Sequence, residues 1–547
     1  MKKLNLIYIF ATSLLALTSC DDYLDKVPDD RAEVNTVDKV AKLLVSAYAG
    51  NNSNLILEMS SDNARDNGST YDFDELEQEE AYLWKDQTST DNDAVSDIWD
   101  ACYMAAAHAN QALAVIEEMG NPASMSAYRG EALLARAWAH FQLANVFCLG
   151  YNPATADTDM GLPYSLAPET TVKPDYQRGT MAELYKHISD DIDEGLPLIN
   201  DNIYTVPKYH FNQKAAYAFA ARFNLFYQKW DKCIEYANAA LGSNPSNYLR
   251  NWTHLVKELA SDYETRCNAF VSASENCNFL LQTAASSSGY ILGAWNLGNR
   301  YGHDQPSIAR QETYRAAGIW GAWDSPVNAG LLMSHSCWGP VQTLNISKYF
   351  GYFEYTDKVN RIGYRRNVYV QLCGDETLLC RAEAYAVKGD LANALKDMNL
   401  WLSTNTGSGL QATQELVNLR YGTFDPETGT GMMYMEDAEG KPLPATAYDV
   451  KLEHYGTPKK HLHPLGFTIG EEGSDQENMI QFILHMRRCQ MMQEGGRWCD
   501  IKRWGIEIAH NREGQPDDLL LLNDPRRALQ LPADVISAGL TPNPRNK

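Results

Sequence analysis

The chain has 547 residues, of which 44% are hydrophobic and 21% are charged, so it can bury a large core, and disordered or fibrous classes are excluded. The 70 Asp and Glu residues outnumber the 47 Lys and Arg residues, which gives a formal net charge of −23 at pH 7. Because an acidic surface repels polyanions, we expect neither nucleic acid nor an anionic membrane as a partner. The 11 cysteines are scattered and form no Cys-x-x-Cys pair, which excludes a disulfide scaffold and a zinc ribbon.

The first 19 residues have the pattern of a signal peptide. Lys2 and Lys3 precede the apolar run 4–17, which is shorter than the roughly 20 residues of a membrane-spanning helix. The run ends in Leu17-Thr18-Ser19-Cys20, which resembles the lipobox of bacterial lipoproteins. We therefore expect cleavage before Cys20 and acylation of its thiol, so that lipid alone holds the mature chain at a membrane. The alternative is an ordinary secretory cleavage site followed by an accidental cysteine.

Residues 20–36 are expected to form an acidic tether. The stretch 21–30 contains five aspartates and Pro28, a composition that favours an extended chain. Asn35 or Thr36 can cap the first helix. We therefore expect the folded body to begin near residue 37 and to continue as one domain to residue 547.

A helical pattern follows the tether. Apolar residues recur at three- and four-residue steps, which predicts helices over 98–119, 127–149 and 181–196. Alanines within these segments allow close helix packing.

Two further helical pairs resemble tetratricopeptide units. The first joins 213–227 to 232–241 through a tight turn, and the second spans 378–401. Such hairpins bury their apolar faces against neighbouring hairpins. We therefore predict a mainly α fold, in which 37–245 and 371–403 form a scaffold of tetratricopeptide-like helical hairpins.

Helical periodicity is lost in the segments 246–370 and 404–475, and also in 60–95. Residues 290–369 contain 14 Trp, Tyr or Phe residues in 80 positions. Long irregular segments inside a compact domain are usually functional. We expect 246–370 and 404–475 to form a loop-rich ligand-binding face on the scaffold, followed by a closing segment, 476–547.

The run around Asp500 is a candidate catalytic group. Arg497, Asp500 and Arg503 are spaced three residues apart, which places them on one face of a helical turn. A carboxylate between two guanidinium groups has a depressed pKa and is a poor general base. We therefore interpret this group as a structural ion-pair network rather than a catalytic one.

Other titratable residues give weaker signals. His461, His463 and His485 lack a further ligand at a useful spacing, so we expect no metal and no cofactor. Cys267 and Cys277 are close enough in sequence to form a disulfide, and this question stays open. Five other cysteines fall on apolar helix faces and are expected to be buried thiols: Cys102, Cys148, Cys233, Cys380 and Cys489.

Several motifs together resemble the SusD/RagB family of lipoproteins. They are the helix with Trp99, Tyr103 and Asn110, the helix from Gly130 to Phe141, the run Glu494-Gly495-Gly496-Arg497-Trp498-Cys499-Asp500-Ile501-Lys502-Arg503-Trp504-Gly505, and the segment 529–545. They occur in the family's order over almost the whole chain after residue 17. The family usually has acidic residues where this chain has Met486 and Gln490, and an aromatic where it has Cys499. We expect these positions to lie in the core, so the departures affect packing and leave the resemblance to the family intact.

The resemblance implies a glycan-binding lipoprotein on the outer face of an outer membrane. It would deliver oligosaccharides to a SusC-like TonB-dependent transporter, and it would not be an enzyme. Two alternatives stay open. One is a surface glycoside hydrolase, which needs two convergent carboxylates. The other is a purely structural partner lipoprotein of the transporter.

We expect the glycan-binding residues in the irregular segments, because a pyranose ring stacks its C–H face on an aromatic ring and offers its hydroxyl groups to polar side chains. The aromatic candidates are Trp295, Tyr301, Trp320, Trp323 and Trp338, with Trp84 in second place. The polar candidates beside them are Asn63, Asp66, Asn92, Asn296, Asn299, Arg300 and Asp324.

Overall fold

The computed structural model describes residues 36–545, apart from 74, 172–175, 294–297, 322–329, 408, 426, 429 and 448–457. The expected signal peptide, Cys20 and all of the tether except Thr36 lie outside the described residues. Among the helices that the model describes, none is both long enough and apolar enough to cross a membrane.

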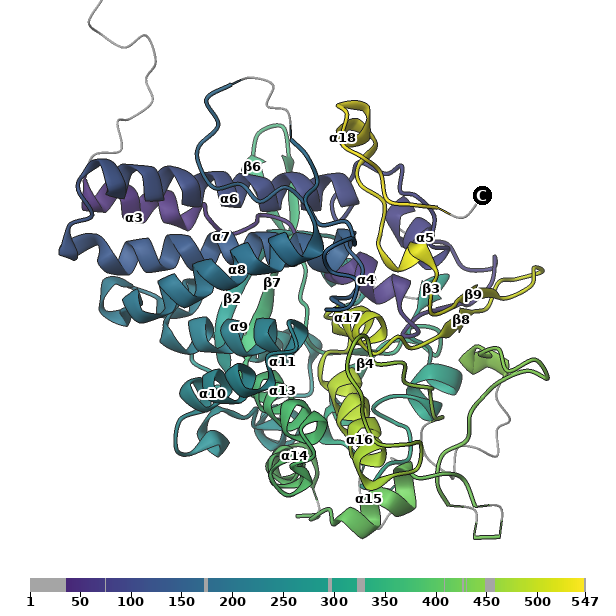
Figure 1. Cartoon of the computed structure of the whole chain (residues 1–547). Helices are drawn as coiled ribbons and strands as arrows, with labels where there is room; N and C mark the ends of the chain where they lie inside the picture. Colours follow the sequence, from purple (N-terminus) through teal and green to yellow (C-terminus); the bar gives the residue numbers. More distant parts are fainter. Residues whose placement is uncertain are drawn as a thin grey trace, which may run out of the picture.

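Helices are the predominant regular elements of the molecule (Figure 1). In the first half of the chain they are α3 (Val37–Val45), α4 (Asn54–Ser60), α5 (Leu76–Tyr82), α6 (Val95–Glu118), α7 (Ser126–Phe147), α8 (Met181–Gly195), α9 (Gln213–Phe226), α10 (Trp230–Leu241) and α11 (Tyr263–Phe270). In the second half they are α12 (Ser288–Ile291), α13 (Gly374–Val387), α14 (Leu391–Asn405), α15 (Gln414–Tyr421), α16 (Asp475–Gln490), α17 (Gly496–Arg503) and α18 (Ala533–Ser537).

The long helices pack as successive neighbours, which confirms the predicted mainly α fold. α6 packs on α7, α7 on α8, α9 on α10, α10 on α13, and α13 on both α14 and α16. Phe219 and Phe223 of α9 are fully buried, and the aromatic rings of Trp138 in α7 and Phe219 lie 5.1 Å apart. The helical row is therefore held by an apolar core.

Both predicted tetratricopeptide-like pairs are present. α9 and α10 are joined by a turn in which Gln228 has φ +61°, and α13 and α14 by a turn in which Gly389 has φ +81°. These left-handed conformations reverse the chain after each first helix. The start of the body also agrees with the prediction, because the Thr36 side chain accepts a hydrogen bond from the Lys39 N–H and so caps α3.

The segment 246–370 is less irregular than expected. It contains β2 (Asn278–Ala285), β6 (Tyr352–Asp357) and most of β7 (Ile362–Cys373), which form an antiparallel sheet in the order β2-β7-β6. β2 is buried on both faces, so its sequence lacks the alternation of a half-buried strand. That absence of alternation concealed the strand in the sequence.

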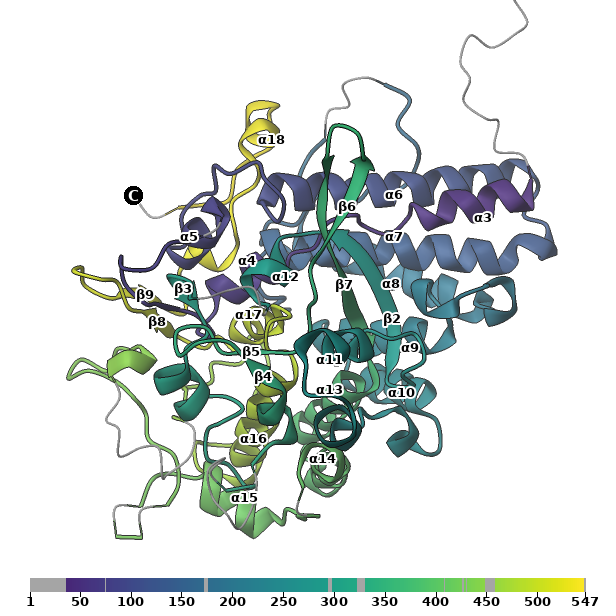
Figure 2. The ribbon, with the colours of Figure 1, turned by 180° about the vertical axis from the view of Figure 1, so that it is seen from behind.

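The remaining strands are short, and one of their ladders, β1 (Arg65–Asp66) with β3 (Tyr301–Gly302), pairs segments that are distant in sequence. Two further two-stranded ladders are formed by β4 (Cys337–Trp338) with β5 (Asn345–Ile346), and by β8 (Ile508–His510) with β9 (Asp518–Leu520). Figure 2 shows β3, β4 and β5 on the side of the molecule that faces away from the viewer in Figure 1.

The ion-pair network around Asp500 is present, with one partner changed. Asp500 in α17 pairs with Arg503 at 2.7 Å, and its second guanidinium partner is Arg487 of α16 at 3.0 Å. Arg497 instead pairs with Asp62 at 2.8 Å, so its predicted pairing with Asp500 is wrong. Burial alone would raise the pKa of Asp500, but Arg487 and Arg503 hold it below its usual range. Packing of α16 on α17, which local spacing does not reveal, determines the second partner.

The five cysteines predicted on apolar helix faces are buried, as expected. Cys267 and Cys277 are also buried, and both are free thiols in the structure. Burial raises the pKa of the Cys277 thiol to about 12, so it is protonated at neutral pH.

Candidate functional site

Four of the predicted glycan-binding residues lie outside the described residues. They are Trp295, Asn296, Trp323 and Asp324. Their placement therefore stays a prediction, as does acylation of Cys20.

Three predicted aromatic residues are core residues. Trp84 and Tyr301 are 4% and 1% exposed, and Trp320 is fully buried. The Trp84 ring stacks on His510 with 4.1 Å between ring centroids, and the Tyr301 ring lies 4.7 Å from that of Tyr82. Because these rings have almost no accessible face, none of the three offers a stacking surface for a sugar. The polar residues that stand beside these three aromatics in the sequence therefore do not indicate a sugar-binding surface at these positions.

Two predicted amide side chains are also buried. Asn63 accepts a hydrogen bond from Arg488 at 2.8 Å and donates one to Glu58 at 3.0 Å, so its amide is engaged inside the protein. Asn299 is 2% exposed. Asn92 is half-buried and remains accessible.

The structure brings Asp66 and Arg300 together. β1 pairs with β3 so that Asp66 lies opposite Tyr301, and the Arg300 guanidinium donates to both carboxylate oxygens of Asp66, at 3.0 and 3.2 Å. The backbone N–H of Gly68 donates to one of these oxygens at 2.9 Å, and that of Glu513 to the other at 3.2 Å. Segments more than 230 residues apart therefore meet at this carboxylate.

The charge state of Asp66 is fixed by these contacts. Burial acts to raise its pKa, but the hydrogen bonds from Arg300 and from the backbone N–H groups hold the pKa below its usual value. The carboxylate is consequently ionised at neutral pH, and its oxygens already have partners. Arg300, whose side chain is 24% exposed, is the member of the pair that can contact a ligand.

Accessible residues surround this junction. Tyr71 and Phe73 are half-buried, and the Phe73 ring lies 6.0 Å from that of Tyr301. The Asn67 side chain donates to the carbonyl of Gln342, in the connection between β4 and β5, at 3.0 Å. β4, at the other end of this connection, ends at Trp338, the predicted aromatic that is 47% exposed and whose ring lies 6.3 Å from that of Tyr263.

We call the set Asn67, Tyr71, Phe73, Arg300 and Trp338 the loop face. Two of its members, Arg300 and Trp338, were predicted from the sequence. The other three were missed, although they follow Asp66 closely in the irregular stretch 60–95, which was the signal that could have found them.

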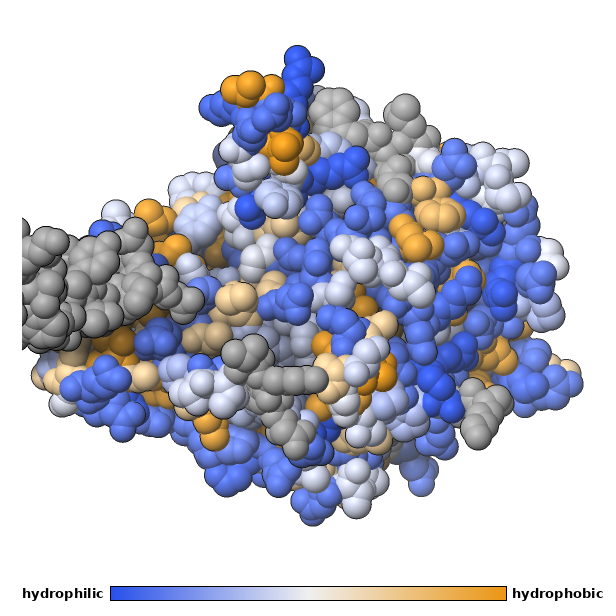
Figure 3. All heavy atoms as spheres, turned by 90° about the horizontal axis from the view of Figure 1, so that it is seen from above, coloured by the Kyte–Doolittle hydropathy of each residue, from blue (hydrophilic) through white to orange (hydrophobic). Residues whose placement is uncertain are grey.

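A separate cleft of about 750 Å³ lies between α6, the segment 163–169 and α18. Trp99, Tyr103 and Tyr176 supply its aromatic lining. Figure 3 looks down on the side of the molecule that carries α6 and α18, and shows apolar residues among hydrophilic ones there. The volume is in the range of small-molecule sites.

The cleft also contains two carboxylates, Asp100 and Glu169. Burial raises the pKa of Asp100, and the negative charge of Asp534 raises it further. Tyr176 donates a hydrogen bond to Glu169 at 2.6 Å. Sequence reasoning missed this cleft because Trp99 and Tyr103 had been interpreted as a packing helix.

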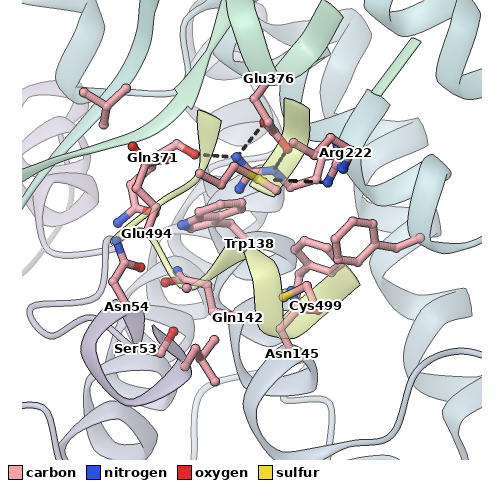
Figure 4. A pocket seen from close by; sticks show the side chains of 18 residues that line it. Ser53, Asn54, Trp138, Gln142, Asn145, Arg222, Gln371, Glu376, Glu494 and Cys499 are labelled. Atoms are coloured by element: carbon pink, nitrogen blue, oxygen red, sulfur yellow. Dashed lines mark hydrogen bonds and ion pairs between the residues drawn. The ribbon is translucent and has the colours of Figure 1, made fainter. Parts of the chain in front are cut away.

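A smaller polar pocket of about 80 Å³ lies between α4, α7, α9 and α17 (Figure 4). Trp138 and Gln142 project into it from α7, and Arg222 and Glu376 close one side as an ion pair of 2.7 Å. The volume is enough for a few water molecules and too small for a sugar ring. We therefore assign it no ligand.

Two of the three histidines considered for a metal site have other partners. His461 lies 2.9 Å from Glu436 and stacks on Tyr434, and His485 is buried in α16 at 3.0 Å from the Tyr421 hydroxyl. Within the described residues, no group of three or more His, Cys, Asp or Glu side chains is placed to hold a metal ion.

The sequence was compared with models of known protein families and with curated proteins. Residues 22–225 match the family model SusD-like_3, which is described as starch-binding and associating with the outer membrane. No curated protein matches the chain.

Many solved structures share the fold. A SusD superfamily protein from Bacteroides vulgatus ATCC 8482 aligns with a TM-score of 0.58 and 16% identity, over 94% of this chain and 100% of its own. One from Bacteroides thetaiotaomicron VPI-5482 aligns with a TM-score of 0.57 and 16% identity, over 93% and 100%. A SusD-like carbohydrate binding protein from Bacteroides vulgatus ATCC 8482 aligns with a TM-score of 0.56 and 14% identity, over 92% and 96%.

Proposed function

We propose that the chain, whose residues 22–225 match the SusD-like family model, is a SusD-like cell-surface glycan-binding lipoprotein that delivers its ligand to a SusC-like TonB-dependent transporter. We further propose that the glycan binds at the loop face and that the chain catalyses no reaction. Acylated Cys20 would anchor it to the outer membrane.

The observation that carries the proposed site is the junction of β1 with β3. It joins two irregular segments, each of which was expected to contribute to ligand binding, and it presents half-buried aromatic rings beside a fixed guanidinium. Tyr71, Phe73 and Trp338 supply surfaces for the apolar faces of pyranose rings. Arg300 and the amide oxygen of Asn67, whose amide N–H groups donate to the carbonyls of Asn299 and Gln342, supply polar groups for their hydroxyls. Trp295 and Trp323 remain part of the proposal, because they neighbour these segments in sequence.

The expected affinity is modest. Burying about 100 Å² of apolar surface per stacked sugar contributes roughly 2.5 kcal/mol before the costs of ordering. Two stacked sugars would then give a Kd between about micromolar and millimolar. Weak binding of this kind suits a protein that passes its ligand on to a transporter.

The transporter partner is proposed from the family and from the helical scaffold. Arrays of helical hairpins present extended surfaces that bind other proteins. A pull-down of the acylated protein from detergent-solubilised membranes should recover a barrel protein, and recovery of none would contradict this part of the proposal.

If the protein were a glycoside hydrolase, the cleft beside α6 would be its candidate catalytic site. Asp100 and Glu169 are two carboxylates in one aromatic cleft, and the pKa of Asp100 is raised, as that of a general acid would be. This makes the cleft the competing site, both for hydrolysis and for glycan binding.

Affinity electrophoresis against a panel of plant, microbial and mucin glycans tests the proposal. We expect retardation by at least one glycan, with no shortened product released. Trp338→Ala should weaken the retardation several-fold, whereas Tyr176→Ala, the matched aromatic truncation in the cleft, should leave it unchanged. Release of product, or the reverse order of the two variants, would contradict the proposal. Retardation by no glycan would favour the structural partner lipoprotein.

Incorporation of radiolabelled palmitate tests the anchor separately. We expect label in the wild-type protein and none in Cys20→Ala. An unlabelled wild-type protein would refute lipidation without affecting glycan binding.

A further inference from the structure

The turn between β6 and β7 forms a projecting ribbon with an unusual surface. Figures 1 and 2 both show this hairpin rising above the layer formed by α3 and α6. At its tip, Val359 is 91% exposed and Ile362 is 58% exposed. Large aliphatic side chains at such exposure are costly in water unless another surface covers them.

Aromatic side chains surround the ribbon behind its tip. Tyr352 pairs with Arg366 across the ladder, Phe353 with Arg365, and Glu354 with Tyr364. Successive residues of a strand point to opposite faces, so aromatic rings lie on both faces of the ribbon. Four of them are between 40% and 49% exposed: Tyr352, Phe353, Tyr355 and Tyr364.

The tip has a defined conformation. The Asp357 side chain accepts hydrogen bonds from the backbone N–H groups of Val359 and Asn360, at 2.8 and 3.0 Å. Arg361 takes a left-handed conformation with φ +56°. Val359 is thus held at the outermost point of a folded turn.

The charge of the ribbon is opposite to that of the chain. Residues 352–366 contain four basic residues, Lys358, Arg361, Arg365 and Arg366, and two acidic ones, Glu354 and Asp357, so their net charge is +2 (4 − 2). The whole chain has a net charge of −23. Arg365 pairs with Glu75 at 2.7 Å and Arg366 pairs with Glu354, whereas Lys358 directly precedes Val359 and Arg361 follows it by two residues. The tip, with Lys358 and Arg361, is therefore the place at which an anionic surface can approach an otherwise repulsive protein.

We propose that the ribbon tip inserts Val359 and Ile362 into the headgroup region of a phospholipid surface. The inference rests on the proposed anchoring through Cys20. The order of side chains along the ribbon matches the depth profile of a membrane interface: aliphatic at the tip, cationic beside it and aromatic behind it.

The start of the described chain lies within reach of the same surface. α3, with which the body begins, lies in the layer from which the ribbon rises (Figure 1). The 16 residues 21–36 span at most roughly 55 Å when fully extended. An acyl chain on Cys20 would keep this side of the molecule near the bilayer, and the ribbon would provide a second contact that fixes its orientation.

A depth measurement tests the inference. The acylated protein with Asn360→Cys is labelled with an environment-sensitive fluorophore and reconstituted into vesicles of phosphatidylethanolamine and phosphatidylglycerol with brominated acyl chains. Protein without an added cysteine gives the labelling background. The control position is Leu419→Cys on α15, an exposed apolar site at the opposite end of the molecule in Figure 1. We expect quenching at 360 to be at least about threefold stronger than at 419, because only the tip enters the interface. Equal quenching at the two positions would overturn the inference.

A second variant separates insertion from mere proximity. Val359→Asp combined with Ile362→Asp should abolish the excess quenching at 360 while the acyl chains keep the protein on the vesicles. Its Tm should not change, because both side chains are exposed. Persistence of the quenching would overturn the inference, as would protection of the tip only when a second protein is added.

Failure of this inference can be distinguished from failure of the proposed function. Palmitate incorporation reports the anchor and glycan retardation reports ligand binding, both on the same preparation. A protein that passes both of these tests but shows no excess quenching refutes only the ribbon contact.

Discussion

The helical scaffold and the irregular part of the molecule are stabilised in different ways. In α9 and α10, apolar side chains of neighbouring helices form the core, and successive helices contact each other along the chain. The buried ion pairs of the scaffold join successive helices, as Arg136 of α7 does with Asp191 of α8 at 2.7 Å. In the irregular part, ion pairs connect distant segments: Asp62 with Arg497 at 2.8 Å, and the buried Asp304 with the partly exposed Arg65 at 2.9 Å. The first arrangement follows local periodicity, whereas the second depends on the complete fold.

This difference has an energetic consequence. Buried ion pairs contribute little net stability compared with apolar packing, but removal of one partner leaves an uncompensated charge. We therefore expect the buried ion pairs that join separate elements to be sensitive to single charge deletions, and the exposed scaffold surface to tolerate them.

The largest expected effect is that of Asp500→Ala. Arg487 and Arg503 would then share the single carboxylate of Glu383, at 3.2 and 2.8 Å, and one buried positive charge would be left uncompensated. The free energy of unfolding should therefore fall by about 3–5 kcal/mol. Denaturant unfolding followed by circular dichroism measures the loss. A loss below about 1 kcal/mol would show that the network does not hold α16 and α17 together.

A pH-dependent effect is expected at Glu58, which joins α4 to the turn before α17. Burial raises its pKa to about 7, although the N–H groups of Gln493 and Gly495 donate to it. A raised pKa means that the carboxyl group's contribution is complete below about pH 4.5 and is lost as the pH rises to about 7.

The variant Glu58→Gln should therefore lose less stability than the wild type between pH 5 and pH 7.5, with a difference of up to about 3 kcal/mol. Thermal or denaturant unfolding at both pH values measures it. Identical pH dependence in the two proteins would show that Glu58 titrates normally.

A smaller effect is expected at the loop face. Arg300→Ala removes two hydrogen bonds from Asp66, and because Arg300 is partly exposed the loss should be about 1 kcal/mol. Amide exchange at 65–68 and 300–302 should accelerate while exchange in α9 stays constant. Unchanged exchange at the β1–β3 junction would mean that this pair does not join the two segments.

The smallest effect is expected on the scaffold surface. Asp193→Asn removes an exposed ion pair between α8 and Lys232 of α10, and should change the free energy of unfolding by about 0–1 kcal/mol. A loss comparable to that of Asp500→Ala would invalidate the distinction between buried and exposed ion pairs.

The same contrast explains what the sequence could reveal. The helical pair 213–241 was predictable because alanines and aromatics repeat at helical spacing along one continuous stretch. β2 was missed because burial on both faces removes its alternation. The helices could therefore be predicted from local sequence patterns.

The candidate site was only partly predictable. Arg300 and Trp338 were found because charged and aromatic residues stand out in an irregular segment. Trp320 and Tyr301 have the same sequence character, yet they are buried, since burial depends on contacts with distant residues such as Tyr82 and His485. The pairing of Asp500 with Arg487 could not be predicted for the same reason, because it depends on the packing of α16 on α17.

Hydrogen exchange with a retained glycan tests the central claim most directly. The account predicts slower amide exchange in 65–73 and 298–302 when the glycan is bound, with no change in α9 or at the cleft segment 163–169. Protection confined to the cleft, or absent from both places while the glycan remains bound, would contradict the assignment of the loop face as the binding site.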